Sequence, residues 1–530
     1  MKKPIVFFSM LIAFGMWMST SEAQTYFVRS DGNDMNNGLS WATAFQTVQR
    51  ALEAACMNSP ADVWVAAGIY YPDQGPSQTP GERESTFAIC EGVSLYGGFD
   101  GSETMLEERD WESNVTVLCG DLNIDDTYPM VSVTSNPNFA DNAYHVVTIS
   151  GMNNDGVVDG FTIRGGWADG DEMSYQNIGG GILMREMSRP GVYNCNITFN
   201  YALAGGGIYN WQSFPTIGDC IFERNAAESS GGAILYGNTG GAGMPLTISN
   251  TRFFSNRAEI GGGAYYSTSN QTQFINCEFR SNFTNGSGGA IEHNTGGNSD
   301  FINCTFSGNH ASSGGGAIAN IAAINVSIIN CTFSTNGAGG IGGAIAGTAS
   351  NSFVIQNSII WNNYASGVNN TLSASISFFV FEDGPMISHS IIANSNGSGA
   401  NWEEGLGIDG GGNLDTNPLF VDPADFSTPH PEGDWRLTCL SPAIDRGNNA
   451  FVPVGIDTDL DGNERIFNGV RVDMGAFEFQ GSSCIPIPTL STWMTIILAL
   501  IMIIAAILTL RYSMIKKVHP VKEKIKTPKN

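Results

Sequence analysis

A phrase of about 26 residues recurs through the middle of this chain and limits the folds open to it. It holds an apolar residue, Asn or Asp, Cys, any residue and Phe, then Asn three positions on, and finally Gly-Gly-Ala/Gly-Ile. The glycine phrase ends at seven positions, spaced by 26, 26, 31, 26, 27 and 27 residues: Ile182, Ile208, Ile234, Tyr265, Ile291, Ile318 and Ile345. Such repeats bury their apolar faces on one another, so a solenoid is expected.

The residues inside each phrase alternate in polarity. In 275–279, the alternation places Cys277 and Phe279 on one face of a strand and Asn276 and Glu278 on the other. We expect two short strands per coil, with Gly and Asn at the corners, where positive φ is often needed. Helical repeats are excluded, because the windows are rich in Gly, Asn, Ser and Thr and carry no 3.6-residue apolar stripe. The sequence therefore predicts an all-β parallel β-helix.

Five cysteines share one position of the repeat: Cys195, Cys220, Cys277, Cys304 and Cys331. Metal sites favour convergent pairs such as C-x-x-C, which are absent, and other coils carry Thr251, Ser358 or Phe161 at this position. Stacked, buried free thiols are the better interpretation. Elsewhere, Cys439–Cys484 and pairs among Cys56, Cys90 and Cys119 stay open as disulfides.

Both ends of the chain have the composition of targeting segments. Residues 1–24 combine Lys2 and Lys3 with an apolar run and small residues near Ala23, as a secretory signal peptide does. Residues 493–510 form an uncharged apolar stretch of 18 residues before a basic tail, which predicts a transmembrane helix with a cytoplasmic tail. We expect an exported protein anchored in the bacterial cell envelope, with the membrane as a partner.

The segments between these ends follow from the repeat. Residues 25–150 are expected to form an N-terminal cap and irregular first coils, in which the amphipathic segment Ala42–Ala55 is a capping helix. Regular repeats occupy 151–414, a closing module 415–480 and a linker 481–488. The sorting motif and transmembrane helix occupy 489–512, and the basic cytoplasmic tail 513–530.

Charge narrows the classes of ligand. The formal net charge is −26, and no lysine lies between residues 4 and 515, so nucleic-acid binding is excluded. Divalent cations are more compatible as ligands with this acidic, lysine-free region. Asp457, Asp459 and Asp461 stand at alternate positions before Gly462, like the first half of an EF-hand loop, although Asn468 replaces the final Glu. We predict calcium as a structural ligand here, with a plain acidic turn as the alternative.

The repeat resembles that of the polymorphic outer-membrane protein and right-handed β-helix families, through Phe-x-x-Asn and Gly-Gly-Ala-Ile. Residues 417–422, 441–445 and 473–478 are similar to a choice-of-anchor module, which precedes various anchors. The segment with Ile487, Pro488, Thr489, Leu490 and Trp493 resembles an IPTL-type C-terminal sorting signal, which implies a sorting enzyme as a partner. It departs from that pattern at Thr492 and Met494, where Glu and Gly are usual.

The fold that this resemblance implies also hosts polysaccharide lyases and hydrolases, so a catalytic site has to be considered. Pectin-type hydrolases of this fold use Gly-His-Gly and Arg-x-Lys motifs, and neither motif occurs between residues 4 and 515. One candidate group places Arg185 and Arg189 near acidic residues of the loop 169–172. The other is Glu292 with His293, where a solvated surface pair is the simpler interpretation. Neither forms a catalytic constellation, so no catalytic residue is predicted.

Three functions are compatible with the sequence. The leading one is a noncatalytic, adhesin-like surface or envelope protein that presents a rigid acidic β-helix from a membrane anchor. The alternatives are a lyase or hydrolase of the pectate-lyase-like class and a binding module for a glycan or protein.

Overall fold

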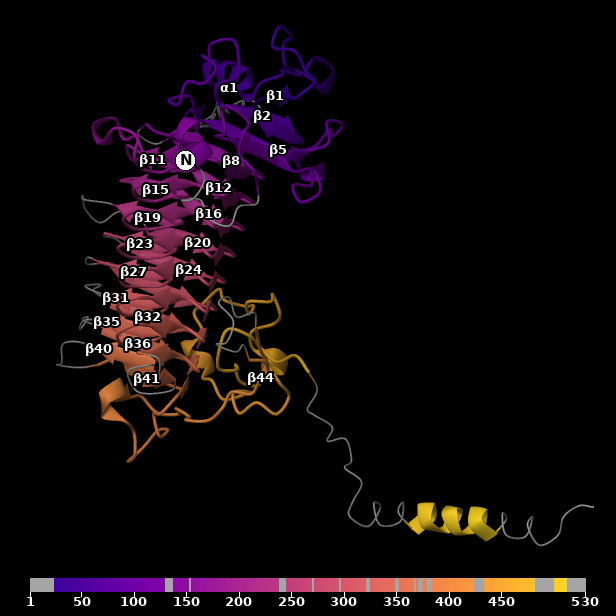
Figure 1. Cartoon of the computed structure of the whole chain (residues 1–530), viewed down its shortest axis with the longest axis vertical. Helices are drawn as coiled ribbons and strands as arrows, with labels where there is room; N and C mark the ends of the chain where they lie inside the picture. The colour runs from indigo at the N-terminus through magenta and orange to yellow at the C-terminus, as the bar shows by residue number, and fades with distance from the viewer. Residues whose placement is uncertain are drawn as a thin grey trace, which may run out of the picture. The chain divides into compact units, whose positions relative to one another are not determined.

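The computed structural model describes residues 23–128, 137–151, 154–237, 245–268, 271–294, 297–320, 325–347, 352–366, 368–369, 375–378, 384–423, 433–481 and 500–511. The chain divides into two compact units, Met1–Gln480 and Gly481–Asn530. The first unit contains a parallel β-helix, visible in Figure 1 as a stack of short strands. The predicted all-β solenoid is confirmed.

Four sheets run along the solenoid within the described residues. Sheet 1 has 13 strands from β1 (Gln24–Val28) to β43 (Ile408–Asp409), and sheet 2 has 11 from β3 (Gly68–Tyr70) to β42 (Ile391–Ile392). Sheet 3 has 9 from β10 (Trp167–Ala168) to β39 (Val368–Asn369), and sheet 4 has 10 from β4 (Phe87–Ile89) to β40 (Ile376–Phe378).

Each regular coil visits these sheets in turn. One coil contains β24 (Thr272–Ile275), β25 (Glu278–Arg280), β26 (Phe283–Thr284) and β27 (Ile291–His293). The expectation of two strands per coil was therefore wrong. Strands of two or three residues are too short to show a full alternating pattern, and the corners between them break its phase.

Inward positions keep the same kind of side chain through several successive coils. Phe222, Phe253, Phe279, Phe306 and Phe333 stack in sheet 2, with neighbouring ring centroids 4.5–5.0 Å apart and nearly parallel rings. Both Cys277 and Phe279 are completely buried, as the alternation predicted. The corner before them is Asn276, at φ 53°, a left-handed conformation that Asn tolerates better than most residues.

The asparagines three residues after each Phe form a second buried column. Their amides donate to the next Oδ1 along the axis, at 2.9–3.1 Å, in this order: Asn200, Asn225, Asn256, Asn282, Asn309, Asn336 and Asn363. Each member from Asn225 to Asn336 also donates to a backbone carbonyl of the preceding coil. They lie at corners as predicted, but their side chains point inward and are almost fully buried.

The repeat cysteines are buried free thiols, as predicted. In three of them the sulfur atom lies 3.4–3.7 Å from a backbone carbonyl oxygen of the preceding coil: Cys195, Cys277 and Cys331. Burial raises the pKa of Cys277 and Cys331, which holds them as neutral thiols. Nearer the N-terminus, Cys56 pairs with Cys90, and Cys119 is free and buried. Cys439 is disulfide-bonded, and Cys484, its predicted partner, lies outside the described residues.

The predicted N-terminal helix is shorter than its sequence pattern. Helix α1 spans Val48–Met57, and a separate 3-10 turn occupies Trp41–Thr43. The helix begins where the Thr47 hydroxyl accepts a hydrogen bond from the Arg50 amide at 3.3 Å, a normal N-cap arrangement. Its apolar face packs on β1 and on β2 (Ala61–Ala66), with Val48 and Leu52 buried in the solenoid core.

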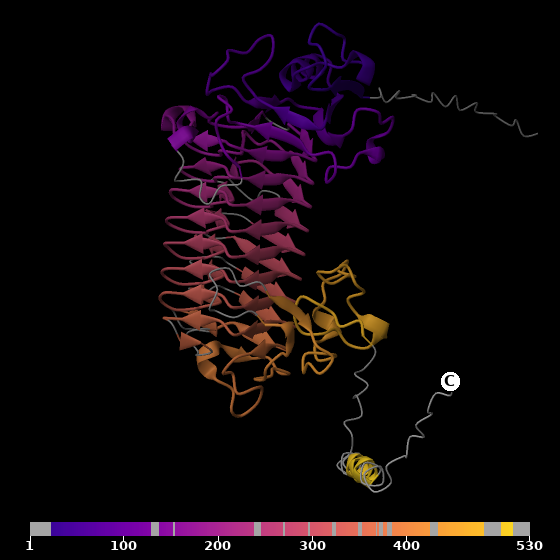
Figure 2. The ribbon, with the colours of Figure 1, turned by 45° about the vertical axis from the view of Figure 1, so that its right-hand side comes forward.

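Residues 415–423 and 433–480, called the module below, lie beside the last coils (Figures 1 and 2). Its only described strands are β44 (Phe420–Asp422) and β45 (Asp434–Leu437), which pair antiparallel. The module covers the flank of sheet 2, because its Trp435 and Met474 share a core with Ile359 and Ile391 of the solenoid. Leu406 instead belongs to the solenoid core, and Trp402 packs against that core.

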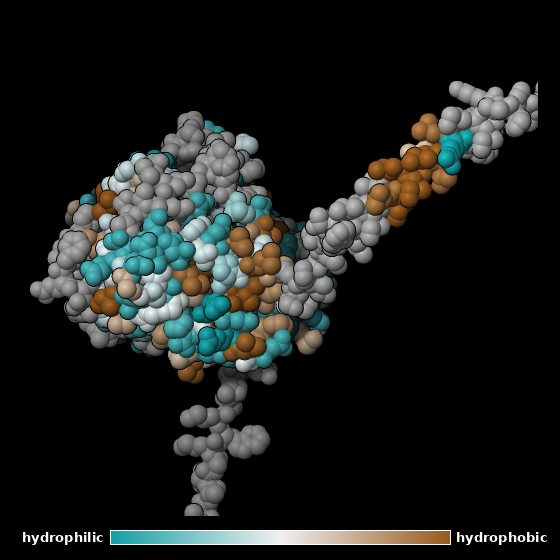
Figure 3. Space-filling view, turned by 90° about the horizontal axis from the view of Figure 1, so that it is seen from below, coloured by the Kyte–Doolittle hydropathy of each residue, from teal (hydrophilic) through white to brown (hydrophobic). Residues whose placement is uncertain are grey.

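In the second unit the structure describes a helix over residues 500–511 with exposed apolar side chains, visible in Figure 3. None of the helices in the described part of the chain has both the length and the apolar character needed to span a bilayer. The transmembrane helix over 489–512 therefore stays a prediction. The signal peptide up to residue 22 and the sorting-signal residues Ile487, Pro488, Thr489, Leu490 and Trp493 lie outside the described residues.

Candidate functional site

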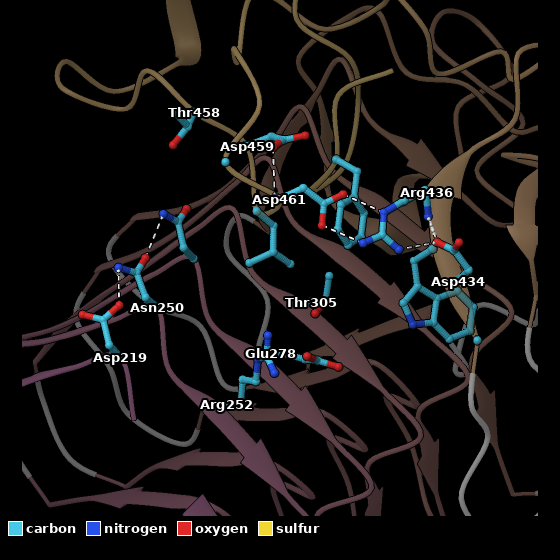
Figure 4. Close-up of a pocket in the computed structure, with 16 residues that line it drawn as sticks. Asp219, Asn250, Arg252, Glu278, Thr305, Asp434, Arg436, Thr458, Asp459 and Asp461 are labelled. Carbon is cyan, nitrogen blue, oxygen red and sulfur yellow. Dashed lines mark hydrogen bonds and ion pairs between the residues drawn. The ribbon is translucent and has the colours of Figure 1, made fainter. Parts of the chain in front are cut away.

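A polar cleft of about 620 Å³ lies where the module meets the flank of the solenoid (Figure 4). Corners and strands of the middle coils form one wall, and β45 with the loop 458–462 forms the other. Its charged lining residues come from both sides: Asp219, Arg252, Glu278, Asp434, Arg436, Asp459 and Asp461.

The solenoid wall includes an outward column of sheet 2. Arg252, Glu278 and Thr305 are paired in register on successive coils, followed by Thr332 and Ile359. The column changes from charged to apolar as the module covers it: the Ala476 amide donates to the Thr332 hydroxyl at 3.0 Å, and Ile359 is buried. This change, at the position between Cys and Phe of each repeat, is a sequence signal for a covered flank that the sequence predictions did not use.

A chain of corner side chains runs beside that column. Asn250 donates to the Asp219 carboxylate at 3.0 Å, Asn276 donates to Asn250 at 3.2 Å, and Asn303 donates to Asn276 at 3.0 Å. Asn303 also donates to the Thr458 carbonyl of the module at 2.7 Å. These corners therefore fix the module to the solenoid and leave the Asp219 carboxylate at the far end of the chain.

The module wall is organised by Arg436. Its guanidinium donates to both carboxylate oxygens of Asp461, at 2.6 and 2.7 Å, and to Asp434 at 3.1 Å. The guanidinium carbon also lies 5.2 Å from the ring centroid of Phe477. The two acids raise the pKa of Arg436, so this cation stays charged. A bidentate pair of this kind holds both side chains in fixed orientations.

Glu278 is the acidic residue of the cleft lining whose pKa is clearly shifted. Burial raises the pKa of its carboxyl, while the charges of Arg280, Arg252 and Arg436 oppose that shift. A carboxyl with a raised pKa takes up a proton more readily than a free one and can also accept a hydrogen bond from a hydroxyl group. The alternation in the sequence placed Glu278 on the outer face but gave it no role, because the module that buries it lies far along the sequence.

The predicted calcium residues Asp457, Asp459 and Asp461 are not brought together as a ligand set. Asp461 binds Arg436, and Asp459 accepts backbone hydrogen bonds from Asn463 and Glu478 at 2.8 Å. Asp457 is exposed. Across the residues that the structure describes, no group of three or more His, Cys, Asp or Glu side chains is placed to hold a metal ion. The acidic turn instead orders the module through its own amides and Arg436.

The residues of the first catalytic candidate, Arg185, Arg189 and the acidic loop 169–172, make separate contacts. Asp169 binds Arg83 at 2.7 Å, whereas Arg185 lies over the ring of Tyr175. Arg189 is exposed. The acidic loop and the two arginines are therefore not assembled into one site.

The interpretation of Glu292 and His293 as a solvated surface pair was wrong, because both are buried. Burial raises the pKa of Glu292 to about 8 and lowers that of His293 to about 4, so both are held neutral near pH ~7. Alternation separates them across the strand β27, and the His293 ring meets the Ser299 hydroxyl at 3.2 Å inside the solenoid.

Comparisons with known families agree with the fold. Residues 126–279 match the right-handed β-helix region, and residues 303–321 match the Chlamydia polymorphic membrane protein repeat. No curated protein matches the chain. A solved rhamnogalacturonan lyase structure is similar over 75% of this chain and 91% of that one, with 11% identity and a TM-score of 0.31, too distant to bear on function.

Proposed function

We propose that this protein is a noncatalytic, surface-exposed β-helix of the bacterial envelope, with an adhesin-like role. The observation that carries the proposal is the contrast between the inner and outer faces of the coils. Phe, Cys and Asn repeat inside, whereas outward positions change from coil to coil, as Arg252, Glu278 and Thr305 do. A rigid interior with variable outer side chains suits a scaffold that displays binding groups.

The remaining support comes from sequence. A polymorphic membrane protein repeat matches residues 303–321, which is in keeping with a membrane or surface protein. Residues 1–24 carry the features of an export signal, and residues 489–512 those of a sorting motif and membrane anchor. In this proposal the basic tail 513–530 stays in the cytoplasm, and a glycan or protein outside the cell is the partner.

Surface display can be measured on intact cells that produce the full chain. An antibody raised against the solenoid cannot cross an intact envelope and would label only chains displayed outside the cell, and a cytoplasmic protein in the same cells would serve as the control. We expect the solenoid to be labelled before lysis, and removal of residues 489–530 to release it into the medium. Labelling only after lysis would contradict display.

A polysaccharide lyase or hydrolase is the second candidate, favoured by one observation. Glu278 combines a raised pKa with nearby arginines in an open cleft, an arrangement that can act in proton transfer to a sugar. The full chain should be screened against acidic and neutral polysaccharides, with and without calcium, for release of unsaturated or reducing sugars.

If Glu278 were catalytic, Glu278→Gln would abolish that release, and Glu112→Gln, at an exposed site outside the cleft, would leave it unchanged. The noncatalytic proposal expects no release from any of the three proteins. Calcium-dependent release that requires Glu278 would overturn it.

A further inference from the structure

The outward column of sheet 2 that forms one wall of the cleft becomes steadily more buried along the solenoid axis. Arg252 is exposed, Glu278 is partly buried and Thr305 is 2% exposed, although the three are paired in register on successive coils. One coil further, the Thr332 hydroxyl accepts from the Ala476 amide of the module, and the column is covered. The cleft is therefore a wedge that is open at Arg252 and closed beyond Thr305.

A second polar row runs beside this column and ends at the same place. It consists of corner residues that line the cleft on successive coils: Asp219, Asn250 and Asn276. The row meets the module where Asn303 donates to the Thr458 carbonyl at 2.7 Å. Each amide nitrogen of Asn250 and Asn276 has two N–H groups, of which one is used within the row. A ligand between the two rows therefore meets polar groups at every coil, roughly 4.8 Å apart.

The side chains of the column are not paired with one another. Among the residues drawn in Figure 4, no hydrogen bond or ion pair reaches Arg252, Glu278 or Thr305. On the opposite wall, by contrast, Arg436 is held by Asp461. A guanidinium offers only donors, a carboxylate only acceptors and a hydroxyl both. The column thus presents each type of hydrogen-bonding group on a separate coil.

The charges around the cleft disfavour ligands of either sign. Five of its charged lining residues are acidic and two are arginines, so an anionic ligand is disfavoured in the cleft as a whole. A cationic group meets the opposite obstacle at Glu278, because three arginines act electrostatically on that carboxyl: Arg280, Arg252 and Arg436. A neutral ligand rich in hydroxyl groups meets neither cost and can use the donors and the acceptors alike.

The closed end and the size of the cleft decide which part of a glycan can enter. The volume of about 620 Å³ lies within the range of ~300–1,000 Å³ that is typical of small-ligand sites. A chain that lies along the column can leave the wedge toward Arg252 but not past Thr305, because Thr332 and the module occupy that path. An internal segment needs an exit at both ends, so the end of a chain is the part that fits.

We propose that this wedge binds the terminal unit of a neutral glycan whose chain lies along the flank of sheet 2. Hydroxyl groups of the terminal unit donate to Glu278 and exchange hydrogen bonds with Thr305, and the next unit accepts from Arg252. This inference rests on the proposed function, because it names the partner of the displayed solenoid. Binding by the purified protein does not depend on display, so failure of antibody labelling and failure of sugar binding are separate results.

The test uses the purified full chain in detergent and isothermal titration calorimetry. The neutral probes are linear oligosaccharides of glucose, galactose, mannose and N-acetylglucosamine, and the charged probes are those of glucosamine and galacturonate. We expect saturable binding of at least one neutral series, with both charged series bound about tenfold more weakly or less. Absence of binding in every neutral series, or tighter binding of a charged one, would overturn the proposal.

The stoichiometry of binding tests recognition of the chain end. For the neutral sugar that binds, chains of increasing length should each take up one protein molecule, because each chain has one end of the right kind. A groove for internal segments would take up more protein as the chain grows. A number of bound molecules that rises with chain length would therefore overturn the proposal.

Paired substitutions locate the site. Thr305→Arg places at the closed end the side chain that Arg252 already carries in the same column, and it should abolish binding. Thr162→Arg makes the same change in this column outside the cleft and should leave affinity unchanged. Glu278→Gln removes a charged acceptor and should weaken binding about tenfold, whereas Glu112→Gln should not. Equal affinity of wild type and Glu278→Gln would overturn the proposal even if Thr305→Arg does not fold.

Discussion

The solenoid and the flanking module solve the same problem, the burial of polar groups, in different ways. Inside the regular coils the buried polar column is neutral, made of asparagine amides that satisfy one another and the backbone. Inside the module the buried polar groups are ionisable. Arg465 is fully buried and donates to the carbonyls of Asp473 and Gly475 at 3.1 and 2.7 Å, with Glu478 at 3.9 Å.

This difference follows from regularity. A coil that repeats every 26 or 27 residues offers each amide an identical partner one coil away, so a neutral ladder can continue through successive regular coils. The module has two short strands and no repeat, and long side chains must reach scattered carbonyls. Because removal of one member of a buried charged network leaves its partners uncompensated, the module should be the region more sensitive to single substitutions.

The largest effect is expected for Arg465→Ala. It removes the donor to two backbone carbonyls and the cation beside Glu478, and it should destabilise the module by about 3–5 kcal/mol. Hydrogen exchange of peptides from 433–480 should speed up strongly, while peptides from 272–320 change little. Arg446→Ala, at an exposed site of the same module, is the matched control. Unchanged exchange over 433–480 would show that the charge network is not what holds the module.

A smaller loss, about 2–3 kcal/mol, is expected for Asn282→Ala in the solenoid. The Asn282 amide donates to the Phe253 carbonyl and to Asn309, and its oxygen accepts from Asn256, so an alanine interrupts the ladder in its middle. Chemical denaturation should show this loss. Asn285→Ala in the same coil is the control, because Asn285 is exposed and bonds only a surface glutamate among the described contacts. Equal midpoints for the two variants would contradict a structural role for the ladder.

The two regions also differ in how far sequence predicted them. The coil register, the inward Cys and Phe and the thiol state of Cys277 followed from periodicity, because each repeat shows the same environment several times. The fourfold division of each coil did not, since a strand such as Phe283–Thr284 is too short to show a pattern. The cleft was missed because it depends on where an irregular segment docks, and local sequence does not encode the contact of Asn303 with Thr458.

The pH dependence should separate the regions further. Burial raises the pKa of Glu478 to about 8, above the ordinary value of 4.5 that it has when unfolded. Between these values the unfolded chain has lost a proton that the folded module keeps, so stability is fully present at low pH and falls as pH rises. The slope is at most about 1.4 kcal/mol per pH unit for one proton.

Thermal unfolding followed from pH ~5 to ~9 should therefore show Tm falling with pH. Glu478→Gln should remove the part of this slope of Tm against pH that comes from the module. Glu464→Gln, an exposed acid of the same module, should keep the wild-type slope. Glu292→Gln tests the one strongly shifted carboxyl described in the regular coils, whose pKa is also about 8. A Tm that rises with pH in the wild type and in Glu478→Gln alike would contradict the assignment.

The smallest effect is expected for Cys304→Ser. This variant tests whether the buried cysteine column of the solenoid tolerates a hydroxyl group at a position where another coil already carries one. Ser358 occupies the same position two coils later, where its hydroxyl donates to the Gln356 carbonyl at 2.8 Å and accepts from the Cys331 amide at 3.0 Å. A serine at 304 meets the equivalent backbone groups, Ile302 and Cys277, so its hydroxyl is satisfied and the loss should stay below about 1 kcal/mol. Cys304→Ala lacks that hydrogen bond and should cost more. Denaturation midpoints decide the order, and a serine variant less stable than the alanine variant would mean that this column requires an apolar atom despite its carbonyl partners.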